Sequence, residues 1–170
     1  MLYIDFDGVI LDTEILLFKE WKKIHNRHSL PETEKIKYIQ NSDWDYIVSN
    51  SEAINDSIKF LKEMDPSRTA ILTKIHSEKE GKAKLHWAEI NGISQRVILV
   101  PYTVKKTDVV DASGNILIDD CLKNLYDWED NNGKPILFDI DDDNIDSWHK
   151  PNIKGYEKVK SLSEYRRFYD

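Results

Sequence analysis

Five short apolar runs constrain most strongly what this chain can fold into. They cover residues 2–6, 69–72, 96–100, 115–118 and 135–138. Each run is short and too uniformly apolar to have one solvated face, which is typical of strands buried within a parallel sheet. Segments whose apolar residues recur at helical spacing alternate with these runs. We therefore predict an α/β protein in which helices cover both faces of a parallel sheet.

The stretch between the first two runs breaks this alternation, because it is helical throughout. Its apolar spacing and turn residues predict helices over 13–27, 32–40 and 52–64, with a loop over 41–45. We interpret residues 13–64 as a small helical cap inserted after the first strand. Residues 1–12 and 65–170 then form the α/β core.

Composition excludes several classes of protein. The 170 residues carry a formal net charge of -7, which argues against general nucleic-acid binding. Cys121 is the single cysteine, so no internal disulfide can form. No apolar run approaches the roughly 20 residues of a membrane span. The first residues lack the basic and apolar regions of a signal peptide, and we expect a cytoplasmic protein without membrane partners.

Polar side chains stand where three of the predicted strands end. Asp5 and Asp7 close the first run, Thr73 the second, and Asp119 and Asp120 the fourth. Ligands of open parallel sheets bind beyond the carboxyl ends of the strands, so we expect these residues to converge. An isolated pair of aspartates after a strand could equally cap backbone amides in a loop.

Converging carboxylates repel one another unless a cation joins them, and an all-oxygen site with an open face suits Mg²⁺. One carboxylate could then attack phosphorus as a nucleophile, and a second could carry protons. The pair Lys105–Lys106 precedes the fourth run and could stabilise the phosphoryl group.

The motifs have a recognisable order. Residues 5–10 (Asp-Phe-Asp-Gly-Val-Ile) resemble the first motif of the haloacid dehalogenase (HAD) superfamily of phosphatases. Residues 71–73 resemble the second motif, Lys105 or Lys106 the third, and residues 116–120 the fourth. The resemblance spans about residues 1–140 and implies a Rossmann-like core with a type 1 cap. The Leu-Ile-Asp-Asp form of the fourth motif, with Lys-Thr upstream, further resembles the 5'(3')-deoxyribonucleotidase branch.

This resemblance implies roles for the residues at the first motif. Asp5 would be the nucleophile and a metal ligand. Asp7 would be the general acid/base and would offer its backbone carbonyl to the metal. Gly8 would let the chain turn into the cap and lie among the phosphate-binding residues.

The later motifs supply the other implied roles. Thr73 would hydrogen-bond the phosphoryl oxygens, and Asp119 and Asp120 would bind Mg²⁺ directly or through water. Lys106 is preferred over Lys105 as the lysine that neutralises nucleophile and phosphate, because Lys-Thr followed by two valines fits the nucleotidase pattern better.

Two further features have simpler interpretations. Among the aromatic residues, Trp21 fits core packing, whereas Trp44 in the predicted polar loop is the better candidate for a substrate contact. The acidic run over 139–146 lacks the glycine and the glutamate of an EF-hand, so we interpret it as a solvated loop.

We therefore predict a Mg²⁺-dependent phosphomonoesterase that acts on a small organic phosphate, with a (deoxy)nucleoside monophosphate as the leading substrate class. Dehalogenases of the same superfamily tend to lack the second aspartate, here Asp7. The alternatives are a non-catalytic or regulatory HAD-like domain that binds phosphate or a partner protein, and a phosphosugar phosphatase or mutase.

Overall fold

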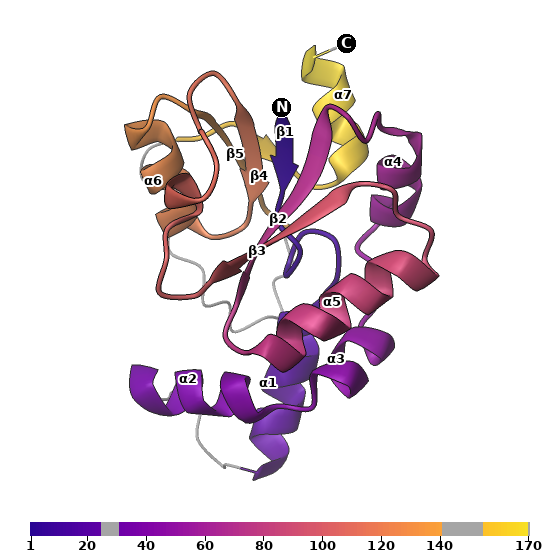
Figure 1. Ribbon diagram of the computed structural model, residues 1–170, viewed down its shortest axis with the longest axis vertical. Helices are drawn as coiled ribbons and strands as arrows, with labels where there is room; N and C mark the ends of the chain where they lie inside the picture. Colours follow the sequence, from indigo (N-terminus) through magenta and orange to yellow (C-terminus); the bar gives the residue numbers. More distant parts are fainter. Residues whose placement is uncertain (25–30, 141–154, 170) are drawn as a thin grey trace.

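A single six-stranded sheet forms the centre of the computed structural model, which describes residues 1–24, 31–140 and 155–169 (Figure 1). Its strands are β1 (Leu2–Ile4), β2 (Thr69–Ile75), β3 (Arg96–Pro101), β4 (Ile116–Asp119), β5 (Lys134–Phe138) and β6 (Lys158–Val159). The strand order is β3-β2-β1-β4-β5-β6, and every neighbouring pair is parallel. The predicted parallel α/β sheet, with a Rossmann-like strand order, is confirmed.

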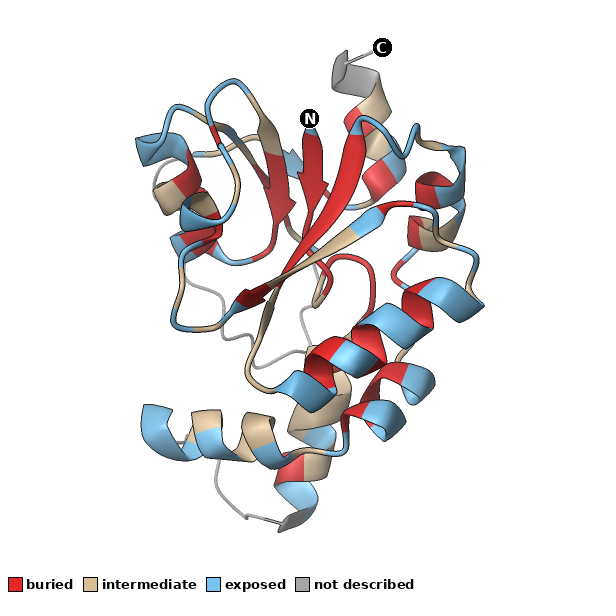
Figure 2. Ribbon diagram, viewed as in Figure 1, coloured by how far each residue is buried: buried red, intermediate tan, exposed pale blue. Residues whose placement is uncertain are grey.

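Helices cover both faces of this sheet. The helical elements of the described residues are α1 (Thr13–Ile24), α2 (Glu32–Asn41), α3 (Trp44–Asn50), α4 (Ser57–Glu63), α5 (Glu78–Ile90), the 3₁₀ turn η1 (Lys106–Asp108), α6 (Leu122–Asp130) and α7 (Leu162–Tyr169). Side chains alternate between the two faces along each strand. Ile4 and Ile118 join a buried cluster with α3, α4, α5 and α7, whereas Tyr3 and Leu117 join a second cluster with α6. The buried strands between exposed helix faces are visible in Figure 2.

The helical segment after β1 does not pack as one unit. Helices α1 and α2 lie beyond the carboxyl ends of the strands, on the same side as the loop that follows β1 (Figure 1). In contrast, Ile47 of α3 and Phe60 of α4 belong to the same buried cluster as Ile4 of β1. Helices α3 and α4 of the predicted cap (13–64) therefore contribute to the buried cluster around β1, and the bounds of the cap remain a prediction.

Local sequence signals place the ends of α5 well. Ser77 accepts a hydrogen bond from the backbone N–H of Glu80 at 3.2 Å, as a helix N-cap does. Gly92 has a φ of +66°, which suits the residue just beyond a helix. The carboxylate of Glu80 accepts a hydrogen bond from the backbone N–H of His76 at 2.6 Å, just before this helix.

Some predictions lie partly outside the described residues. These are the last residues of the predicted helix 13–27 and the acidic run 139–146 beyond Ile140. Asp139 is described, and its carboxylate pairs with Lys158 at 2.5 Å. Across the described ranges, each helix is either too short or too polar to cross a lipid bilayer.

Candidate active site

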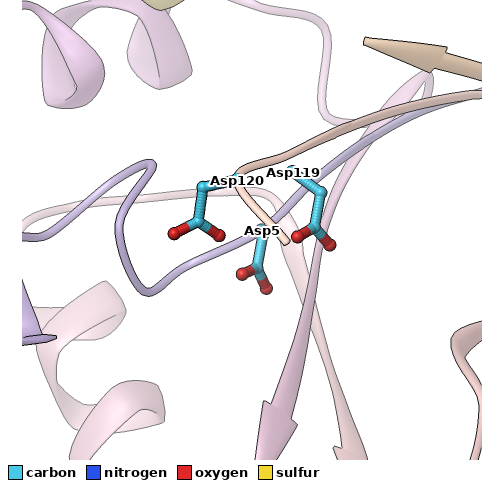
Figure 3. A group of neighbouring side chains, drawn as sticks. All are labelled: Asp5, Asp119 and Asp120. Atoms are coloured by element: carbon cyan, nitrogen blue, oxygen red, sulfur yellow. The ribbon is translucent and has the colours of Figure 1, made fainter. Parts of the chain in front are cut away.

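Three carboxylates meet where β1 and β4 end side by side. Asp5 follows β1 directly, Asp119 is the last residue of β4, and Asp120 comes next. Parallel pairing sets Ile4 opposite Ile118, and the N–H of Asp5 donates to the Ile118 carbonyl at 2.9 Å. One carboxylate oxygen from each aspartate lies within 4.8 Å of the others, and all three side chains are buried (Figure 3). The strand register thus produces the convergence that the sequence predicted.

Lys106 lies beside this trio and compensates part of its charge. Its ammonium is 2.7 Å from Oδ1 of Asp5 and 2.6 Å from Oδ2 of Asp119. Burial raises the pKa of Asp5 to about 7, although the ammonium acts in the opposite direction. Burial alone would lower the pKa of Lys106, but Asp119 and Asp5 hold it above its ordinary value. Both interactions favour a protonated, fixed lysine.

Asp119 and Asp120 differ in their surroundings. Asp119 accepts from the backbone N–H of Cys121 at 2.8 Å and from the side-chain amide of Asn124 at 3.0 Å, which fix its orientation. Burial, followed by the nearby carboxylate of Glu14, raises the pKa of Asp120 well above its ordinary value. Asn124 was not predicted from the sequence. The one feature that could have indicated it is its position in the first turn of the helix that follows the fourth motif.

The donor set of the trio fits Mg²⁺. Asp5, Asp119 and Asp120 offer carboxylate oxygens, which are the hard ligands that this cation prefers. Lys106 contacts two of the three carboxylates, so ionising all three at these buried positions is costly without a further positive charge. A divalent cation would supply that charge.

Asp7 has hydrogen-bond partners that differ from those of the trio. Its Oδ1 accepts from the hydroxyl of Thr13 at 2.7 Å, and its Oδ2 accepts from Lys84 at 2.5 Å and from Thr73 at 3.4 Å. Thr73 is buried two residues before the end of β2, and its hydroxyl lies beside Asp7, as the sequence predicted for residues near the strand ends. Asp5 and Asp7, two residues apart, therefore have different partners.

Lys84 was not identified from the sequence. It lies on α5 with its side chain fully buried, and its ammonium also contacts Glu80 at 2.7 Å. Its one sequence signal is the i,i+4 spacing from Glu80, which suggests a solvated helical ion pair as readily as a buried one.

The structure separates the two candidate lysines. Lys105 is exposed and pairs with Asp127 at 2.8 Å, away from the trio. The expectation that Lys105 might bind phosphate is wrong, because its side chain is exposed. Lys106, the first residue of η1, is buried instead.

Gly8 contributes space at the site. Its φ of +72° lies in the left-handed region, and a Cβ at this position would collide with the carboxylate of Asp120. Its N–H donates to the carbonyl of Leu11 at 2.8 Å, so this group is already used within the turn. Gly8 therefore leaves room for the carboxylate of Asp120, and its expected phosphate contact remains a prediction.

Trp44 does not lie where the sequence predicted. It begins α3 instead of lying in a loop, its side chain is buried, and its indole N–H donates to the carbonyl of Ile39 at 2.8 Å. A core position explains this aromatic residue, and the expected substrate contact is wrong. Trp21 is buried as predicted and packs edge-on against Tyr38.

A largely apolar pocket lies between α1 and α2. It encloses about 360 Å³, part of it open to solvent, and its lining residues are Glu14, Leu17, Phe18, Trp21, Lys35, Tyr38 and Ile39. Glu14, which lines this pocket, is also a carboxylate that raises the pKa of Asp120.

Comparisons with known proteins agree on the fold. No protein-family model and no curated protein matches the sequence. The magnesium-bound HAD-hydrolase YfnB from Bacillus subtilis matches with a TM-score of 0.62 at 12% identity, over 98% of this chain and 96% of that chain. A haloacid dehalogenase-like hydrolase from Burkholderia xenovorans matches with a TM-score of 0.61 at 12% identity, over 99% and 95%. A HAD phosphatase from Thermococcus onnurineus matches with a TM-score of 0.58 at 14% identity, over 98% and 96%.

This chain has a haloacid dehalogenase-like fold. At such low identity the likeness concerns the fold alone, and chemistry has to be argued from the residues of the site. In this fold, the carboxylates of Asp5, Asp119 and Asp120 stand at the carboxyl edge of the sheet, where ligands of open α/β sheets bind.

Proposed function

We propose that the protein is a Mg²⁺-dependent phosphomonoesterase that uses Asp5 as its nucleophile and Asp7 as its general acid/base. The observation that carries the proposal is the division of partners between these two aspartates. Asp5 lies in the buried trio against Lys106, whereas Asp7 faces Thr13, Thr73 and Lys84. One carboxylate is thus fixed beside a cation site, and its neighbour is free of that cluster to handle protons.

The reaction would proceed in two displacements at phosphorus. An oxygen of Asp5 attacks phosphorus, the bond from phosphorus to the ester oxygen breaks, and Asp7 donates a proton to that oxygen. Water then attacks phosphorus and gives a proton to Asp7 as the bond to Asp5 breaks. Both carboxyl groups return to their starting states, and the products are an alcohol and phosphate.

The other residues would bind and stabilise the phosphoryl group. Lys106 and Thr73 would interact with its oxygens, since the ammonium and the hydroxyl both lie next to the reacting aspartates. Asp5, Asp119 and Asp120 would hold Mg²⁺ through carboxylates, and Asp7 through its backbone carbonyl. The bound metal would neutralise negative charge that develops on the phosphoryl oxygens.

The pocket between α1 and α2 supports a substrate with a flat or apolar group. Its lining is mainly apolar, with aromatic surface from Phe18, Trp21 and Tyr38. A (deoxy)nucleoside monophosphate carries a flat base that would pack against such aromatic side chains. A sugar phosphate would leave the aromatic wall without a partner, so we rank nucleotides first.

A phosphate-release screen tests this function. The protein would be incubated with 4-nitrophenyl phosphate, nucleoside monophosphates and sugar phosphates, with Mg²⁺ and with EDTA, beside Asp5→Asn. We expect Mg²⁺-dependent release, fastest with a nucleotide, and none with Asp5→Asn. Absence of release from every substrate by folded wild-type protein would favour the non-catalytic alternative. Formation of an isomer without free phosphate would indicate a mutase.

A further inference from the structure

A buried ion pair on α5, between Lys84 and Glu80, lies beside Asp7. The side chains of Lys84 and Glu80 are 0% and 1% exposed, and their charged groups are 2.7 Å apart. The ammonium of Lys84 also donates to Oδ2 of Asp7 at 2.5 Å, to the hydroxyl of Thr73 at 3.1 Å and to the carbonyl of Lys74 at 3.0 Å. These contacts join α5, the end of β2 and the loop after β1.

Stability alone is a weak reason for charges at this position. Burying two charges costs several kcal/mol of desolvation, and apolar replacements of buried ion pairs are often neutral or stabilising. Two aromatic rings lie near Lys84, since the ring centroids of Phe6 and Trp44 are each 5.4 Å from its ammonium. A methionine or leucine would pack well among such rings, so the charge is better explained by the carboxylate that it contacts.

The partners of Lys84 hold its ammonium in one place. Glu80 is itself anchored, because its Oε2 accepts from the backbone N–H of His76 at 2.6 Å while its Oε1 faces Lys84. Asp7 is thereby fixed from two sides, by the ammonium at Oδ2 and by the hydroxyl of Thr13 at Oδ1. A proton carrier that acts in both displacements gains from such preorganisation.

We propose that Lys84, anchored by Glu80, is a positioning residue that holds the carboxylate of Asp7 where it can exchange protons with the leaving group and with water. This inference rests on the proposed function, because it concerns the proton carrier of that reaction. Lys84 touches no reacting atom. Its contribution passes through the orientation of Asp7.

A misplaced Asp7 should affect the two displacements differently, and its effect on the first displacement should depend on the leaving group. With 4-nitrophenyl phosphate, the leaving phenolate needs no proton, so Asp5 can still be phosphorylated when Asp7 is misplaced. Attack by water still needs a base, so the phosphorylated enzyme accumulates. With an alkyl phosphate such as glycerol phosphate, both displacements need Asp7.

The experiment compares the wild type with Lys84→Met, with the double variant Glu80→Gln/Lys84→Met, and with Lys82→Met. The double variant removes both buried charges together, so that neither is left without its partner and folding is protected. Lys82 provides a matched control on the same helix, since its side chain is 73% exposed and pairs with Glu78. Folding of each variant would be checked by circular dichroism.

For the Lys84 variants we expect a burst of about one nitrophenolate per enzyme molecule, followed by turnover reduced by about 100-fold, the scale of general acid–base contributions. The KM should not rise, and Lys82→Met should behave as the wild type. Unchanged turnover would overturn the proposal. Reduced activity without a burst in folded variants would also overturn it, because replacing a residue with a purely structural role lowers only the fraction of active enzyme.

A crystal structure of Lys84→Met separates this inference from the function on which it rests. We expect the Asp7 side chain to leave its position against Thr13 and Thr73. An Asp7 that stays in place would overturn the positioning role whatever the activity. Failure of the wild type to release phosphate from any substrate would instead count against the proposed function.

Discussion

The ammonium of Lys106 lies 2.7 Å from Oδ1 of Asp5, although 101 residues separate the two in sequence. This contact distinguishes the two adjacent lysines, because the ammonium of Lys105 pairs instead with Asp127 at the surface. It also gives Asp5 a fixed positive neighbour inside the protein, where a charge interaction is stronger than in water. The proposed nucleophile is thereby held in place before any substrate binds.

Replacing Lys106 by methionine should lower both activity and stability. Loss of the ammonium leaves Asp5 and Asp119 as adjacent buried carboxylates, and breaking such a pair costs about 3–5 kcal/mol. Turnover should fall about 100- to 1,000-fold, the cost of removing one group that stabilises developing charge. Denaturant unfolding and phosphate release measure the two effects. Lys105→Met should change neither by much, and equal losses in both variants would contradict the assignment.

Replacing Gly8 by alanine should weaken metal binding beyond its effect on the backbone. The new Cβ would collide with the carboxylate of Asp120, one of the expected ligands, at a φ of +72°. Gly114→Ala is the matched control, since its φ is +67° and no atom lies within 4 Å of an added Cβ. Both variants should lose about 1–3 kcal/mol of stability from the backbone conformation. Calorimetry should show weaker Mg²⁺ binding for Gly8→Ala alone, and equal affinities would contradict this role of glycine.

Stability of the metal-free protein should depend on pH through Asp5. Its pKa is raised by burial to about 7 in the folded protein, against an ordinary value of 3.8. Between these values the unfolded chain loses its proton while the folded protein keeps it, so this group's contribution to stability falls as pH rises from about 4 to about 7. The measurement compares the unfolding free energies of the wild type and Asp5→Asn in EDTA across this pH range.

The wild type should lose stability relative to Asp5→Asn as the pH rises through this window. Added Mg²⁺ should restore most of the loss, since metal and proton compete for the same carboxylates. A difference between the two proteins that does not vary with pH would contradict the raised pKa.

Much of the framework could be predicted from local sequence signals. Buried parallel strands need uniformly apolar runs, and their carboxyl ends share one edge, so Asp5, Thr73 and Asp119 could be expected to converge before any coordinates were known. Ser77 and Gly92 also act locally, and α5 begins just after the first and ends just before the second.

Features that depend on packing across the fold could not be predicted in this way. Trp44 sits among polar neighbours in sequence, and only the docking of α3 against α5 turns it inward. Lys84 and Asn124 lie on helices where their residue types are ordinary at exposed positions. Their partners, Asp7 and Asp119, come from other elements, so no local pattern indicates the contacts.

The most direct test of the account is to identify the residue that becomes phosphorylated. Asp7→Asn should take up a phosphoryl group from 4-nitrophenyl phosphate with Mg²⁺ and release it slowly, because the base for water attack is lost. After an acid quench, peptide mass spectrometry should find one phosphoryl group on Asp5, labile to hydroxylamine as an acyl phosphate is. A phosphoryl group on another residue, or turnover of Asp5→Asn at the wild-type rate, would contradict the account.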